Sequence, residues 1–107
     1  MAITAKVSNG VCRVNIQEDL TIYNALDVKK KLGKHLGKAP EMELDLSGIN
    51  EIDSAGLQLF ILLKREAKKE CRVLRLVAHS PAVMDIIDTY GMAAYFGDPM
   101  VMNPDVV

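Results

Sequence analysis

The feature that most constrains the fold is a strand pattern that runs into a helix pattern between residues 41 and 69. Apolar and acidic residues alternate over 41–46, which is the period of a β-strand with one buried face. Beyond a polar turn, residues 54–69 are strongly apolar at helical spacing. The step between the two patterns is Asp-Ser-Ala-Gly at 53–56, so the hydroxyl of Ser54 is expected at a helix N-terminus.

Two further strand patterns stand at the start of the chain. Apolar residues occupy alternate positions over 3–7 and again over 12–16. Between them lies Asn9-Gly10, the dipeptide that most strongly signals a tight hairpin. We therefore predict an antiparallel strand pair at the N-terminal side of the fold.

A first helix is predicted over residues 25–36. Its apolar residues recur three or four positions apart, and lysines fill the other faces. Gly37 follows as a helix end signal, and either Thr21 or Asn24 is expected to be the N-cap.

The remaining patterns complete an alternating order. A strand is predicted over 73–78, followed by Ser80-Pro81, where serine caps a third helix and proline takes its first position. A short last strand is expected over 94–96, and residues 98–107 form an irregular tail outside a single domain of residues 1–97. The order β-β-α-β-α-β-α-(β) predicts an α/β fold with a mixed sheet of four to five strands and three helices mostly on one face.

Composition excludes several classes of function. The 13 basic and 14 acidic side chains nearly cancel, so no broad field favours nucleic acid or an anionic membrane. No secretory signal is visible and no apolar run approaches the roughly 18 residues of a membrane span, which predicts a cytoplasmic protein without membrane insertion. Cys12 and Cys71 stand far apart without a nearby histidine pair, so neither a metal nor another cofactor is expected.

The chain carries no familiar catalytic motif. Catalysis by Ser54 would need a base, and His79, at the end of a predicted strand, is the candidate. A loop or cap histidine is the commoner role for such a residue, so we do not expect an enzyme. A helix N-terminus instead suits a phosphoryl group, because unpaired backbone N–H groups and the helix dipole favour negative charge there.

Segment 41–56 with the helix behind it resembles the STAS domain family of bacterial anti-sigma-factor antagonists. Ser-Pro-Ala-Val at 80–83 and Tyr-Gly-Met at 90–92 fit the same family, and the resemblance covers about residues 3–96. It implies a binding module in partner-switching signalling, and nothing in the sequence demands more than a monomer. The implied partners are an anti-sigma factor that is also a serine kinase, and a phosphatase that resets the switch.

The resemblance also implies roles for individual residues. Ser54 would be the phosphoacceptor, whose modification switches binding off, and the implied partner contacts are Asp53, Ser54, Ala55, Gly56, Thr21 and Asn24. Two simpler interpretations stay open: Ser54 as a plain N-cap, and Asp53 as a first-turn acid that favours the helix dipole. The alternative function is a STAS-type structural or regulatory subunit that docks on the ATPase of a membrane lipid-transport ABC complex.

Overall fold

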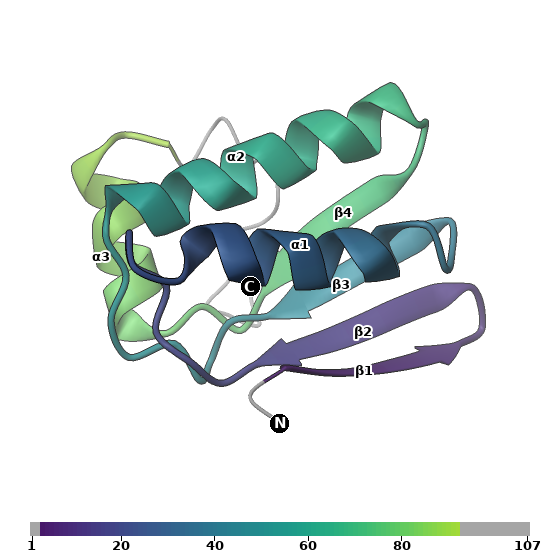
Figure 1. Cartoon of the computed structure of the whole chain (residues 1–107), viewed down its shortest axis with the longest axis horizontal. Helices are drawn as coiled ribbons and strands as arrows, with labels where there is room; N and C mark the ends of the chain where they lie inside the picture. Colours follow the sequence, from purple (N-terminus) through teal and green to yellow (C-terminus); the bar gives the residue numbers. More distant parts are fainter. Residues whose placement is uncertain (1–2, 93–107) are drawn as a thin grey trace.

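Four strands and three helices alternate along residues 3–92, the part of the chain that the computed structural model describes. The sheet has the order β1-β2-β3-β4, in which β1 and β2 are antiparallel and β2, β3 and β4 are parallel. The predicted α/β fold with a mixed sheet is confirmed (Figure 1). The expected strand at 94–96 and the tail at 98–107 lie outside the described residues. The elements are β1 (Ile3–Ser8), β2 (Val11–Ile16), α1 (Ala25–Leu36), β3 (Glu41–Asp45), α2 (Ser54–Lys69), β4 (Val73–Val77) and α3 (Pro81–Thr89).

The β1–β2 hairpin forms as its turn sequence predicts. Asn9 and Gly10 have φ angles of 52° and 78°. Two consecutive positive φ angles are the signature of the turn whose twist matches a two-residue hairpin. The pairing of Ser8 with Val11 closes the loop and sets the register of the whole pair.

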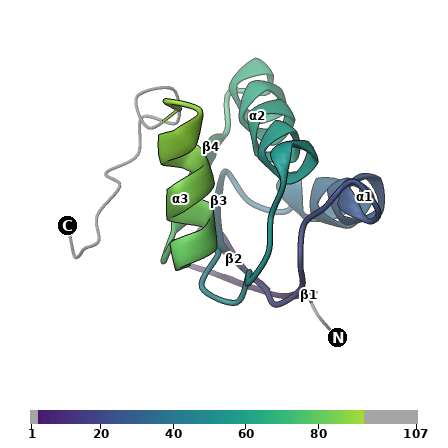
Figure 2. The same ribbon diagram turned by 90° about the vertical axis from the view of Figure 1, so that its left-hand side faces the viewer.

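The helices divide between one face of the sheet and one end of it. Helices α1 and α2 lie side by side on the same face (Figures 1 and 2). Helix α3 contacts α2 and lies at the end of the sheet toward which β4 runs (Figure 1). Because each parallel strand feeds a helix that returns across the sheet, α1 and α2 begin at this same end.

The core lies between the sheet and the two covering helices. Among residues 3–92 it is built mostly from aliphatic side chains, and the ring of Phe60 is fully buried within it. Cys12 belongs to this core, as predicted, and burial raises the pKa of its thiol. The broad apolar surface of α2 is largely core, because Leu57, Leu59 and Leu63 are buried. Within residues 3–92, none of the helices combines the length and apolarity that a membrane crossing requires.

Helix α3 has the predicted cap at each end. The hydroxyl oxygen of Ser80 accepts a hydrogen bond from the N–H of Val83 at 3.2 Å, and Pro81 occupies the first helical position. At the other end Gly91 has a φ of 63°, a conformation that glycine adopts without steric cost. The sequence signals therefore fix both ends of this helix.

Candidate functional site

Two loops meet at the end of the sheet where α1 and α2 begin. One loop joins β2 to α1, the other joins β3 to α2, and the parallel pairing of β2 with β3 places them side by side. Leu20 and Ile52 form an isolated parallel bridge between the loops. The N–H of Leu20 donates to the carbonyl of Glu51 at 2.9 Å, and the N–H of Asp53 donates to the carbonyl of Leu20 at 3.1 Å. The bridge holds the predicted residues 21–24 beside residues 53–56.

Asp53 is the N-cap of α2 and also ties the two loops together. One carboxylate oxygen, Oδ1, accepts from the N–H groups of Ala55 at 2.9 Å and Gly56 at 3.2 Å. The other, Oδ2, accepts from the N–H of Ile22 in the neighbouring loop at 2.9 Å. The N–H of Ile22, followed by those of the helix N-terminus, lowers the pKa of Asp53 from its ordinary value of 3.8. A negative charge is thus fixed at the start of α2.

Ser54 takes the first position within α2 and its side chain is exposed. The interpretation of Ser54 as the N-cap is wrong, because the carboxylate of Asp53 already accepts the N–H groups that a cap would satisfy. The hydroxyl of Ser54 therefore has no capping role in this helix. It faces solvent beside a carboxylate, at the positive end of the helix dipole.

Gly56 is required by the close approach of the two loops. A Cβ on Gly56 would lie 2.6 Å from the carbonyl oxygen of Leu20 and 2.7 Å from Cγ1 of Ile52. The absence of a side chain lets α2 begin directly against the β2–α1 loop. Ala55, between Ser54 and Gly56, is half-buried at the same junction.

Thr21 and Asn24 organise their own loop rather than cap α1. Asn24 stands at the N-cap position, but its side chain accepts from no N–H of the helix. Its Oδ1 accepts from the N–H of Thr21 at 2.9 Å, and its Nδ2 donates to the carbonyl of Asp19 at 2.5 Å. The hydroxyl of Thr21 accepts from the N–H of Tyr23 at 3.3 Å. The capping prediction is right about the position of Asn24 and wrong about its hydrogen bond.

Three exposed apolar side chains flank this junction, and the sequence reasoning missed them. Ile22, Tyr23 and Leu26 are 73%, 95% and 68% exposed. Leu26 lies off the buried face of α1, which is formed by Val28, Leu32 and Leu36. The sequence did contain a signal for this group. Leu26 lies outside the apolar period of the helix, and the apolar pair Ile22-Tyr23 stands in the loop just before it.

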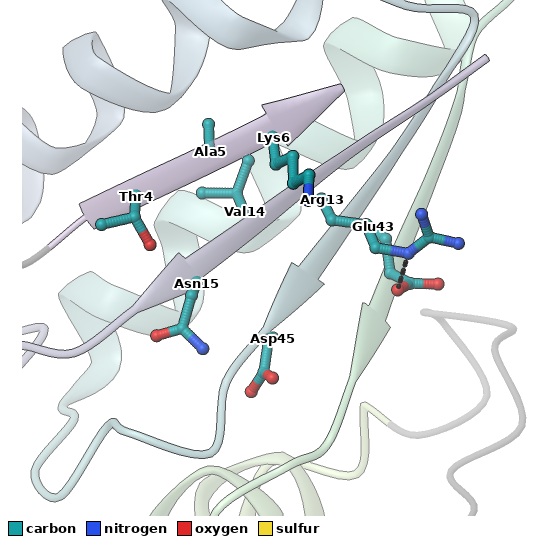
Figure 3. A pocket seen from close by; sticks show the side chains of 8 residues that line it. All are labelled: Thr4, Ala5, Lys6, Arg13, Val14, Asn15, Glu43 and Asp45. Carbon is teal, nitrogen blue, oxygen red and sulfur yellow. Dashed lines mark ion pairs between the residues drawn. The ribbon is translucent and has the colours of Figure 1, made fainter. Parts of the chain in front are cut away.

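The face of the sheet away from α1 and α2 carries a shallow hollow of about 290 Å³ (Figure 3). Charged and polar side chains from β1, β2 and β3 line it, and two of them, Arg13 and Glu43, form an ion pair. Nε of Arg13 lies 3.4 Å from a carboxylate oxygen of Glu43, and Arg75 bridges Glu43 and Glu41. A charged ligand in the hollow would compete with the Arg13–Glu43 pair. Across residues 3–92, His, Cys, Asp and Glu form no group of three or more that could hold a metal ion.

The family model described as "Mlab, STAS domain" matches residues 3–102. This chain is a STAS domain. The match spans both junction loops and all four strands, so the STAS domain includes the whole candidate site. No curated protein is significantly similar to this STAS domain.

Solved structures similar to this STAS domain include several anti-sigma factor antagonists. One from Mycobacterium paratuberculosis has a TM-score of 0.77 at 22% identity, over 88% of this chain and 80% of that chain. A putative antagonist from Thermotoga maritima has a TM-score of 0.77 at 21% identity, over 86% of this chain and 80% of that chain. Phosphorylated SpoIIAA from Bacillus has a TM-score of 0.67 at 16% identity, over 92% of this chain and 91% of that chain. At these identities the likeness shows a shared fold.

The hydrogen bonds of Asp53 predict how stability depends on pH. Asp53→Asn keeps an acceptor for the α2 N-terminus but loses the acceptor for Ile22, so we expect a loss of about 1 kcal/mol at pH 7. Because folding lowers this pKa, the carboxylate contributes fully above about pH 4 and loses its contribution as pH falls further. The difference in the free energy of unfolding between wild type and variant, measured in urea, should therefore be constant from about pH 8 to pH 5. It should become smaller below about pH 4. A gap that widens on acidification contradicts this assignment.

Proposed function

We propose that this STAS domain is a phosphorylation-controlled antagonist of an anti-sigma factor, with Ser54 as the phosphoacceptor. The observation that carries the proposal is the exposed hydroxyl of Ser54 at the first position of α2, released from capping by Asp53. The family and the antagonist-like fold support a regulatory rather than a catalytic domain. The binding partner would be a cytoplasmic serine kinase that is also the anti-sigma factor, and a phosphatase would reverse the switch.

The geometry at Ser54 explains how one phosphate could end binding without unfolding the domain. A phosphoryl group adds about −1.5 to −2 charge and three acceptor oxygens. At the N-terminus of α2 the helix dipole favours this charge, so the fold tolerates it. In a complex with the kinase, however, Ser54 must face the γ-phosphate of ATP, because its oxygen attacks there. A phosphate already on Ser54 is repelled by that anion, and the interface would have to desolvate two adjacent negative charges, the phosphate and the carboxylate of Asp53.

A phosphorylation assay tests the proposal directly. The full chain is incubated with ATP and the anti-sigma-factor serine kinase of the same genome, and the modified residue is mapped by mass spectrometry. We expect one phosphate at Ser54 and none on the Ser54→Ala variant. Ser47→Ala is the matched control, because Ser47 is another exposed serine that follows a strand of this sheet. Phosphate located elsewhere, or absent with every such kinase, refutes Ser54 as phosphoacceptor.

A second candidate function uses the same surface without a switch. The matching family model is described as "Mlab, STAS domain", whereas the antagonists are similar only at the level of the fold. In this candidate the domain is a constitutive subunit that docks on the ATPase of a membrane lipid-transport complex. Co-purification of the full chain with such an ATPase, in the absence of any phosphate on Ser54, would favour it.

A further inference from the structure

The charge of this domain is strongly uneven along α1 and α2, although the whole chain has a net charge of only −1. Residues 17–28 and 46–63 form the junction end and together contain five acidic residues and no Lys, Arg or His. Directly after this end, along the rest of α1 and the loop that follows it, residues 29–38 contain five lysines and no acid. A charge separation of this kind orients a charged partner before contact, since the field extends beyond the surface.

The acidic end also carries the three most exposed large apolar side chains of residues 3–92. Ile22, Tyr23 and Leu26 project from the junction loop and the first turn of α1, with Tyr23 95% exposed. Two acids, Glu18 and Asp19, precede this group in the same loop. The backbone of Glu51, an exposed acid of the other loop, is hydrogen-bonded to the loop that carries the group.

The loop that presents these side chains is held in shape before any partner binds. The N–H of Ile22 donates to Asp53, and the N–H of Tyr23 donates to the hydroxyl of Thr21. The carbonyl of Thr21 accepts hydrogen bonds from the backbone N–H groups of Asn24 at 3.0 Å and Ala25 at 2.8 Å. A loop that is already ordered loses little conformational entropy on docking, which favours affinity.

We propose that Ile22, Tyr23 and Leu26 form an apolar anchor that inserts into a pocket on a protein partner, and that lysines or arginines rim this pocket. Buried aromatic anchors supply much of the energy of protein interfaces, and a surrounding charged rim sets orientation and association rate. An anionic membrane or a nucleic acid fits poorly, because the acidic surround repels both. This inference deepens the proposed function, on which it rests, by naming the chemistry of the partner at the Ser54 site.

Two matched pairs of variants test the anchor and the rim separately. Tyr23→Ser removes the most exposed aromatic anchor, and Val73→Thr alters an exposed apolar residue at the start of β4, at the opposite end of the molecule (Figure 1). Glu51→Lys reverses an acid at the junction, and Glu70→Lys makes the same change where α2 ends. The probe is the purified kinase that modifies the domain or, where no kinase does, the purified protein that co-purifies with the full chain.

The expected results are specific to the junction end. Tyr23→Ser should weaken binding about thirtyfold or more, and Glu51→Lys about tenfold at low salt. Val73→Thr and Glu70→Lys should each change the Kd by less than about twofold. Raising NaCl from about 50 to about 300 mM should weaken wild-type binding and reduce the effect of Glu51→Lys. Thermal unfolding of all four variants should match wild type, because these side chains are exposed.

Several outcomes overturn the inference without touching the proposed switch. Wild-type affinity in Tyr23→Ser, tighter binding in Glu51→Lys, or Tyr23-dependent sedimentation with phosphatidylglycerol vesicles would each do so. If Tyr23→Ser and Glu51→Lys bound normally while Ser54→Asp abolished binding, the switch would stand while the anchor failed. If Ser54→Asp bound normally while Tyr23→Ser and Glu51→Lys did not, the anchor would stand while the switch failed.

Discussion

Replacing Gly56 with alanine should destabilise the domain by about 3 kcal/mol, at the upper end of ordinary overpacking penalties. The added Cβ would meet the carbonyl oxygen of Leu20 at 2.6 Å and Cγ1 of Ile52 at 2.7 Å. The first of these atoms belongs to the backbone, so it cannot move aside by a change of rotamer. The junction must open, which strains the Leu20–Ile52 bridge and the cap formed by Asp53. Thermal unfolding should show a drop of roughly 15 °C.

Gly33→Ala is the matched control for this substitution. Gly33 lies inside α1, and a Cβ there would have no heavy atom of another element within 4 Å. Alanine should therefore stabilise the domain by about 0.5–1 kcal/mol, because glycine loses more backbone entropy in a helix. Both glycines lie in helices, so helix propensity favours alanine at each. A loss of stability at Gly56 and a gain at Gly33 would therefore be due to the close contact of Gly56 with Leu20 and Ile52. Equal effects of the two changes would mean that the junction is looser than described.

Ser54→Asp should abolish partner binding, with a loss of affinity of a hundredfold or more, which corresponds to about 3 kcal/mol. The added carboxylate imitates the charge of a phosphate, at a position that would face ATP in the proposed kinase complex. The same change should leave thermal stability equal or slightly higher, because an acid in the first turn favours the helix dipole. Loss of binding with retained folding is the expected signature of a switch.

Ser54→Asn separates charge from size in this experiment. Asparagine has nearly the shape of aspartate but no charge, so it should retain most of the affinity that aspartate loses. Ser54→Ala should bind like wild type, because the hydroxyl of Ser54 has no capping role. Isothermal titration of the purified kinase against the three variants provides the comparison. Equal losses for Asn and Asp would assign the effect to size and contradict an electrostatic switch.

The fold was largely predictable because its signals are local. Asn9-Gly10 determines the hairpin, and Ser80-Pro81 with Gly91 determines the ends of α3. The start of α2 at Ser54 was also predicted correctly. Each of these depends on backbone conformations and hydrogen bonds within a few residues, which sequence patterns report well.

The candidate site was less predictable because its hydrogen bonds cross between loops. Asp53 accepts from Ile22, which lies 31 positions away in the sequence, and no local pattern reports this contact. The same carboxylate caps α2. Both Asp53 and Ser54 are suitable N-cap residues, so only the structure could decide between them. The exposure of Tyr23 was hidden for a related reason, because burial depends on which elements cover a residue.

The capping of α2 by Asp53 has one more consequence. Position 54 is freed from the task of starting the helix, so its chemistry can be altered without a penalty to folding. A cell could then add and remove a group there repeatedly while the same folded molecules persist. Information would be written on a stable scaffold, and erasing it would require neither synthesis nor degradation of the protein.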